Sequence, residues 1–149
     1  MLDYCATYPD DGILYRASGM VLSGHSDAGF NNETKERSRS GAHIFLSEYE
    51  SIPRWNGPVL TIAQIMKYVV SSAAEADMTA LFLMAKEMVP LQHTLTEMGR
   101  KQPPPPVQSD NFTAVGMTNC TSIPIKSKSW DLRLNWILYR EAQDQFRLY

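Results

Sequence analysis

The sequence predicts an α/β domain in which helices pack on a mixed β-sheet. Three strand-like segments occupy the first half, a long amphipathic helix follows them, and one more strand and two helices complete the chain. This order is typical of layered α/β folds. With 149 residues, 44% of them hydrophobic, the chain can fill one core, and it contains no stretch suited to cross a membrane. We therefore expect one soluble, monomeric domain.

The first three strands are predicted from apolar and β-branched residues that lie between turn-prone segments. They cover residues 19–27, 40–46 and 59–65. Strands spaced this closely favour an antiparallel meander. Residues 1–18 contain a polar turn at Pro9-Asp10-Asp11-Gly12 and are interpreted as a lead-in segment.

The clearest helix is predicted over residues 72–98, which are rich in Ala, Leu, Met and Glu. Ser71 or Ser72 can serve as its N-cap, and Gly99 is expected to end it. Pro90 is expected to kink it.

The second half begins with a proline tract over residues 101–106, interpreted as a stiff extended connector. A proline-rich signalling ligand is the alternative interpretation of this tract. A short strand is expected at residues 107–110, a short helix at 111–117, and a final helix at 129–145, where apolar residues share one face.

Acidic residues lie where predicted strands end and predicted helices begin. They are Asp27, the pair Glu75 and Asp77, Asp110 and Asp131. Four carboxylates that meet at one point are what a pair of hard divalent cations requires. The pattern therefore indicates metal-dependent phosphodiester chemistry.

The long helix offers two acids, Glu75 and Asp77, and at about 100° per residue they point to nearly opposite sides. From Glu75, steps of three and four residues meet a mostly polar course. From Asp77, the same steps meet an apolar stripe, namely Leu81, Met84, Met88, Leu91 and Leu95. Asp77 is therefore predicted to lie on the buried face, where a bound cation would offset the cost of its charge. The alternative is an ordinary helix-start acid at the edge of the core.

The formal net charge of −2 argues against a general nucleic-acid-coating protein, because such proteins need a basic surface. Two basic clusters nevertheless lie near the acids, with solvated loop charges as the alternative interpretation. Cys5 and Cys120 are not arranged for zinc and no secretory signal precedes them, so we expect an intracellular, cytoplasmic protein with free thiols. The clusters are Lys35, Arg37 and Arg39, and Lys126, Lys128 and Arg133.

Four short segments stand in order along the chain: Ser26-Asp27-Ala28, residues 71–81, Asp110-Asn111 and residues 126–133. In order and spacing they resemble the ribonuclease H domain at the end of copia-type retrotransposon polyproteins. That family has Ser-Asp-Ala, then Ser-Ser-Thr-Glu-Ala-Glu-Tyr-Met-Ala-Leu, then Asp-Asn, then Lys-His-Ile-Asp-Ile-Arg. The resemblance covers residues 15–149, and residues 1–14 resemble the tail of a preceding reverse transcriptase.

The resemblance implies a ribonuclease H-like fold, in which a mixed five-stranded sheet of an antiparallel meander plus parallel strands is flanked by helices. It implies an endoribonuclease that hydrolyses the RNA strand of RNA/DNA hybrids during reverse transcription. Two Mg²⁺ ions, for which Mn²⁺ can substitute, would be held by Asp27, Asp77, Asp110 and Asp131. A reverse transcriptase in the same polyprotein is the implied protein partner, and virus-like particles are an implied location.

On the same analogy, each acid has its own role. Asp27 would bridge the two ions, Asp110 would ligate the ion that activates water, and Asp131 would complete the shell of that ion. Asp77 would lie with the other ion near the ribose 2′-hydroxyl, the group that distinguishes RNA from DNA.

Three further residues are candidate contacts to the nucleic-acid backbone. Ser72 precedes the long helix where related ribonucleases H bind a DNA phosphate, although the same hydroxyl can also cap the helix. Arg39 and Lys128 are candidates because of their charge and their proximity to the acids.

The sequence departs from the family where Asp77 replaces Glu, which shortens the side chain by about 1.5 Å, and where Ser129 and Asn135 replace His. Glu75 could assist or replace Asp77. These departures keep open a catalytically silent domain that binds hybrid or connects other domains. An integrase-like nuclease of the same fold is a further alternative, against which the fourth acid argues.

Overall fold

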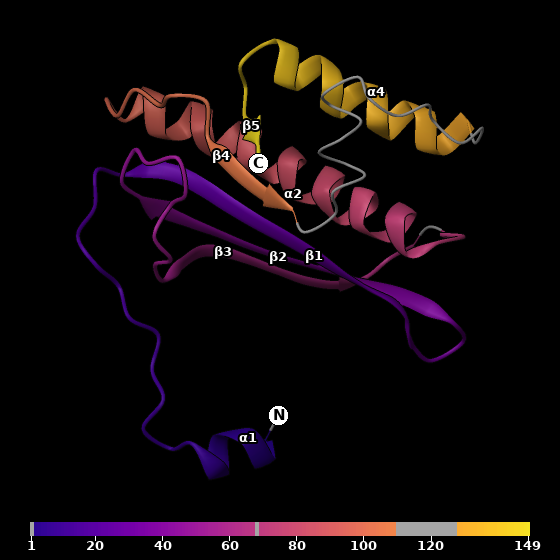
Figure 1. Ribbon diagram of the computed structural model, residues 1–149. Coiled ribbons are helices and arrows are strands. Elements are labelled where there is room, and N and C mark those ends of the chain that lie inside the picture. The colour runs from indigo at the N-terminus through magenta and orange to yellow at the C-terminus, as the bar shows by residue number, and fades with distance from the viewer. Residues whose placement is uncertain (1, 68, 110–127) are drawn as a thin grey trace.

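The computed structural model describes residues 2–67, 69–109 and 128–149 (Figure 1). In these ranges the helices are α1 (Leu2–Thr7), α2 (Ala73–Glu97) and α4 (Lys128–Ala142). The strands are β1 (Val21–Glu33), β2 (Arg37–Ser47), β3 (Pro58–Ile65), β4 (Pro106–Ser109) and β5 (Arg147–Leu148).

The five strands form one sheet in the order β3-β2-β1-β4-β5. β1 pairs with β2, and β2 with β3, in antiparallel fashion, whereas β4 lies parallel to both β1 and β5. This confirms the mixed sheet of a meander plus parallel strands. The fifth strand has two residues after the last helix, too few for a periodic pattern, so the sequence does not locate it.

α2 packs on the sheet through the apolar stripe that begins at Asp77. Leu81, Met84 and Met88 are buried against Leu22 of β1 and Ile44 of β2, as the stripe predicts. Further along the stripe, Leu91 and Leu95 are partly buried. The helix and β1 approach closely at Gly24, where an added Cβ would lie 2.7 Å from the Met88 sulfur and 3.0 Å from the Met84 sulfur.

The ends of α2 follow the sequence prediction. Ser72 is the N-cap, with extended backbone and a hydroxyl oxygen that accepts a hydrogen bond from the Glu75 amide at 3.2 Å. Gly99 follows the helix with φ +85°, a conformation that glycine adopts without steric cost. Pro90 lies within the helix.

Other predicted boundaries differ more. β1 does not end at Asp27 but continues to Glu33, and β2 begins at Arg37, before the predicted start. Beyond Asp27 the two strands continue because their backbones pair with each other. The polar sequence of this segment does not predict that pairing. The short helix expected at 111–117 lies outside the described residues.

α4 lies on the same side of the sheet as α2 (Figure 1), and the two helices touch through an edge-to-face contact of Phe82 with Trp136 at 5.2 Å. On the opposite face of the sheet, the Trp55 ring stacks on Phe45 at 5.7 Å and an interplanar angle of 12°. α1 stands apart from the sheet (Figure 1). Within the described ranges, no helix is long and apolar enough to cross a lipid bilayer.

Candidate active site at one end of the sheet

The parallel pairing of β1 with β4 defines the position of the candidate site. Ser26 of β1 pairs with Ser109, the last residue of β4. Asp27 follows Ser26 in the sequence, and Asp110 follows Ser109, but Asp110 lies outside the described residues. Because parallel strands present their carboxyl ends at one edge of a sheet, this edge is where acids from both strands are expected to meet.

Asp27 is exposed and lies within β1, opposite Gly41 of β2, rather than at the end of a strand. Its Oδ1 accepts a hydrogen bond from the Ala28 amide at 2.7 Å, which fixes the orientation of the carboxylate. By strand alternation, Asp27 shares a face with His25, and Ala28 points to the α2 side. Asp27 therefore presents a solvent-accessible oxygen donor at the end of the β1–β4 pairing.

The first turns of α2 pack against this same part of β1. Ala28 contacts a buried cluster that includes Ala76 and Ala80 of α2. Asp77 follows Ala76 and is half-buried. Asp77 and Asp27 thus come from two elements that touch at Ala28.

Glu75 stabilises the start of α2 through hydrogen bonds from Ser71. Its Oε2 accepts hydrogen bonds from the amide of Ser71 at 2.8 Å and from the hydroxyl of Ser71 at 2.7 Å. Together with the Ser72 cap, this is a variant of the capping box, in which the acid reaches one residue further back. The sequence pattern missed Ser71 as the partner of Glu75, although a serine pair before Ala-Ala-Glu is a recognisable signal.

The side of α2 that begins at Glu75 is mostly polar in sequence, yet it is buried at its start. Glu75 itself is only 8% exposed, and Thr79, one turn later, is fully buried. The reason is α4, because the Arg133 guanidinium donates a hydrogen bond to the Thr79 hydroxyl at 2.9 Å and covers this side of α2. Amphipathicity of one helix does not reveal a second helix that packs on its polar side.

α4 begins close in sequence to two further predicted site residues. Lys128 and Asp131 lie in its first turn. Arg133 lies in the same part of the helix and links it to the second turn of α2. Across the described ranges, no group of three or more His, Cys, Asp or Glu side chains is arranged to hold a metal ion.

Two buried hydroxyls lie on the α2 side of this region. Ser26 and Ser40 are 1% and 0% exposed, and their Oγ atoms have no hydrogen-bond partner in the described structure. Leaving a buried hydroxyl unsatisfied costs about 1–3 kcal/mol. Ser40 pairs with Ala28, so both hydroxyls adjoin Asp27 along the two strands. This end of the sheet is therefore more polar inside than the core around Gly24.

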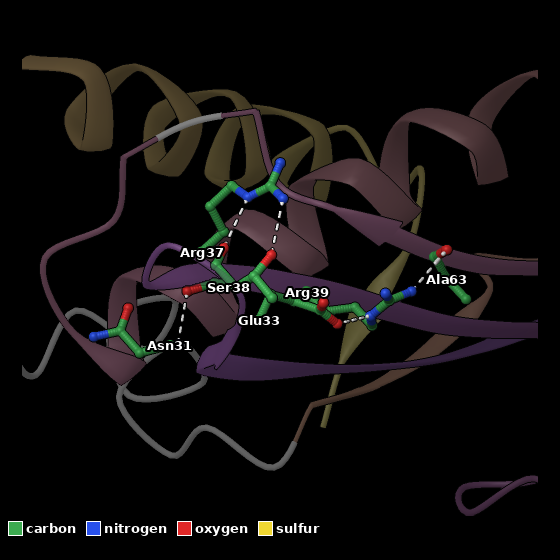
Figure 2. Close-up of polar contacts among 7 residues, drawn as sticks. Asn31, Glu33, Arg37, Ser38, Arg39 and Ala63 are labelled. Atoms are coloured by element: carbon green, nitrogen blue, oxygen red, sulfur yellow. Dashed lines mark hydrogen bonds and ion pairs between the residues drawn. The ribbon is translucent and has the colours of Figure 1, made fainter.

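Arg39, a predicted backbone contact, is engaged within the protein (Figure 2). Its Nε donates to Glu33 Oε1 at 2.6 Å and its Nη1 donates to the Ala63 carbonyl at 3.5 Å. The Arg39 hydrogen bond holds the pKa of Glu33 below its ordinary value of 4.5. Arg39 therefore links β1, β2 and β3.

His25 is half-buried, and its ring lies 5.0 Å from the Trp55 ring. His25 is therefore a packed strand residue. Ser72 is exposed at the start of α2, where its hydroxyl caps the helix.

No protein-family model matches the chain. Over 144 residues, or 97% of its length, the chain is 26% identical to the retrovirus-related Pol polyprotein from transposon TNT 1-94 of Nicotiana tabacum. The match covers 10% of that polyprotein, so the chain corresponds to a short segment of it.

Several solved structures share the fold. A ribonuclease H1 isolated from compost superposes with a TM-score of 0.59 at 11% identity, covering 87% of this chain and 82% of that one. The N-terminal RNase H domain of a Mycobacterium tuberculosis protein gives 0.55 at 15% identity, covering 87% and 78%. Prototype foamy virus protease-reverse transcriptase gives 0.53 at 10% identity, covering 94% of this chain and 18% of that one. The chain therefore has a ribonuclease H-like fold and is similar to a short segment of a transposon Pol polyprotein.

Proposed function

We propose that the chain is a ribonuclease H domain of a retroelement polyprotein and hydrolyses the RNA strand of RNA/DNA hybrids. The observation that carries the proposal is the register of β1 with β4, which pairs Ser26 with Ser109, each the neighbour of a predicted acid. The similarity to a Pol polyprotein segment and the ribonuclease H-like fold support it. A preceding reverse transcriptase is the proposed partner in the same polyprotein.

The described residues fit a site for hard divalent cations in their donor chemistry. Asp27 and Asp77 supply carboxylate oxygens, the ligands that Mg²⁺ prefers, and they come from two elements that touch. In the proposed site, Asp110 and Asp131 complete the set. Two bound Mg²⁺ or Mn²⁺ ions would supply charge neutralisation at the scissile phosphate and an activated water.

The chain's own residues prepare this site in three ways. The Ala28 amide orients the Asp27 carboxylate. Packing of Ala28 against the buried cluster that includes Ala76 and Ala80 sets the distance between β1 and the start of α2. Glu75 is held by Ser71, so Asp77 is the acid of this helix that we assign to the site.

The test is a cleavage assay with labelled RNA/DNA hybrid, RNA duplex and DNA duplex in magnesium or manganese. The intact chain is expected to cut only the RNA strand of the hybrid, and Asp110→Asn is expected to abolish cutting. The proposal fails if the intact chain and the Asp110→Asn variant give the same products. Cleavage of DNA duplex would favour an integrase-like nuclease instead.

A second candidate is a catalytically silent domain that binds hybrid or connects polyprotein domains. The observation that favours it is the short acid at position 77, one methylene shorter than the Glu of the family it resembles. In this case the hybrid would bind without being cut. An Asp77→Glu variant that gains cleavage would support this second candidate for the natural chain.

A further inference from the structure

Beyond Asp27, β1 and β2 continue as a two-stranded ribbon that projects past the rest of the sheet (Figure 1). Gly29 pairs with Arg39 and Glu33 with Arg37, with a register shift between the two pairs. β3 ends at Ile65, which pairs with Arg39. At about 3.3 Å per residue, the turn at Lys35 lies about 20–25 Å from Asp27, which is less than one helical turn of a duplex.

The turn of this ribbon is strained. Lys35 and Glu36 have φ of +63° and +55°, so both are in the left-handed region that Asn-Gly usually occupies in such turns. Asn31 adds a third positive φ of +52° in β1. Such strain costs about 1–2 kcal/mol per residue. The turn therefore has charged residues at positions where Asn-Gly would be unstrained.

Two charges of the ribbon, Arg37 and Arg39, lie on the same face of β2 as the partner of Asp27. Residues 37, 39 and 41 alternate outward, whereas Ser38 and Ser40 are buried toward α2. Gly41 pairs with Asp27. Arg37 and Arg39 on this face, with Lys35 before them in the turn, form a basic row that leads along the ribbon toward Asp27.

The members of this row have different partners (Figure 2). Arg39 is ion-paired with Glu33, and this pair ties the ribbon to the sheet. Arg37 instead donates to the carbonyl and hydroxyl oxygens of Thr34, at 3.2 and 3.5 Å. Because Thr34 is uncharged, the charge of Arg37 is offset only by a weaker attraction to Glu33, and it can attract an external anion.

We propose that the ribbon binds the phosphate backbone of the nucleic-acid duplex. Arg37 and Lys35 contact the phosphates, and Arg39 holds the ribbon in its orientation relative to the sheet. This inference rests on the proposed function, which makes the hybrid the ligand. It also replaces Arg39 by Arg37 as the main backbone contact. Glu36 lies beside Lys35 in the turn, and its negative charge weakens the attraction between the ribbon and the phosphates.

The test is the binding of a short fluorescent RNA/DNA hybrid, measured by anisotropy in calcium at several salt concentrations. Arg37→Gln is expected to raise Kd about fivefold and to lower the slope of log Kd against log salt by about 1. Lys35→Gln is expected to change log Kd by about half as much as Arg37→Gln. Glu36→Gln is expected to lower Kd. The matched control is Lys101→Gln, an exposed cation beyond the far end of α2.

The outcomes separate the ribbon from the active site. If Arg37→Gln and Lys101→Gln bind with equal affinity and equal salt slope, the ribbon inference is overturned. If the hybrid is bound through Arg37 but never cut in magnesium, the ribbon inference stands and the proposed catalysis fails. If the natural chain does not bind hybrid at all, both fail. Circular dichroism of each variant shows that the fold is kept.

Discussion

The two halves of β1 have opposite characters. From Val21 to Ser26, five of six residues are buried, and the α2 side of this half lies beneath the methionines of that helix. From Asp27 to Glu33, no residue is buried, and the polar groups face solvent or bond within the ribbon. One continuous strand thus holds the core with its first half and presents the candidate site and the ribbon with its second.

This difference shows how a small domain separates stability from function. The buried half contributes apolar area and tight packing at Gly24. The exposed half contains an exposed acid and leads into the strained turn at Lys35 and Glu36, features that add little stability and are typical of functional sites. Changes in the first half should alter the free energy of unfolding, and changes in the second should alter activity or binding.

The largest expected effect is on cleavage, from Asp27→Asn in the exposed half. Loss of this carboxylate should lower the rate of hybrid cleavage about a thousandfold, equivalent to about 4 kcal/mol of transition-state stabilisation. The free energy of unfolding should change little, since Asp27 is exposed. Single-turnover cleavage and denaturant unfolding on the same samples check both statements. Equal cleavage rates for variant and natural chain would remove Asp27 from the site.

The second effect concerns the buried half. Leu22 is fully buried in the core, so Leu22→Ala should lower the free energy of unfolding by about 3 kcal/mol. Phe30 in the exposed half is 37% exposed, and Phe30→Ala should cost under about 1 kcal/mol. Urea unfolding of both variants gives the comparison. Equal losses would mean that the two halves do not differ in their contribution to stability.

Much of this fold follows from the sequence, because the meander and the long helix carry strong periodic patterns. The stripe from Asp77 to Leu95 correctly identifies the face of α2 that meets the sheet. The two-residue β5 and the extension of β1 to Glu33 do not follow. Both depend on pairing with a neighbouring strand, a tertiary effect that local sequence does not encode.

The candidate site is predictable in part. Asp27 lies on β1 and Asp77 lies in the first turns of α2, and these elements touch at Ala28; that the two acids hold a metal together stays a prediction. The cap partner of Glu75 and the Arg133–Thr79 link were missed, because each depends on how side chains of separate segments meet. Asp110 lies outside the described residues, and its role and that of Asp131 stay predictions.

The third prediction separates the two acids of α2. Glu75→Gln should lower the free energy of unfolding by about 1 kcal/mol, because the part-buried hydrogen bonds from Ser71 lose their charge assistance. Cleavage should stay within about threefold of the natural chain. Asp77→Asn should instead abolish cleavage. The assignment is wrong if Glu75→Gln is the variant that stops cleavage while it remains folded.

The fourth prediction concerns the strained turn of the ribbon. Glu36→Gly removes the steric cost of φ +55° but adds chain entropy to the unfolded state, so a net gain of about 0.5–1 kcal/mol is expected. Thermal unfolding measures it. As a control, Glu50→Gly replaces an exposed acid whose φ is not positive, and it should not stabilise the protein. A loss of stability in Glu36→Gly would show that the turn is not strained.

The smallest effect is the pH dependence that the Glu33–Arg39 pair adds. The Arg39 hydrogen bond lowers the pKa of Glu33 below 4.5 in the folded state. The pair therefore stabilises the fold above pH 4.5, and this contribution disappears as the pH falls through the lowered pKa. Glu33→Gln should thus reduce Tm slightly at pH 7 and leave it unchanged at pH 3. In an Arg39→Gln background the pH 7 effect of Glu33→Gln should shrink, because only the weaker attraction of Arg37 is left. If Glu33→Gln changes Tm at pH 7 equally with Arg39 and with Gln at position 39, the Glu33–Arg39 pair does not stabilise the ribbon. The contrast between the two halves of β1 must then be explained without this pair.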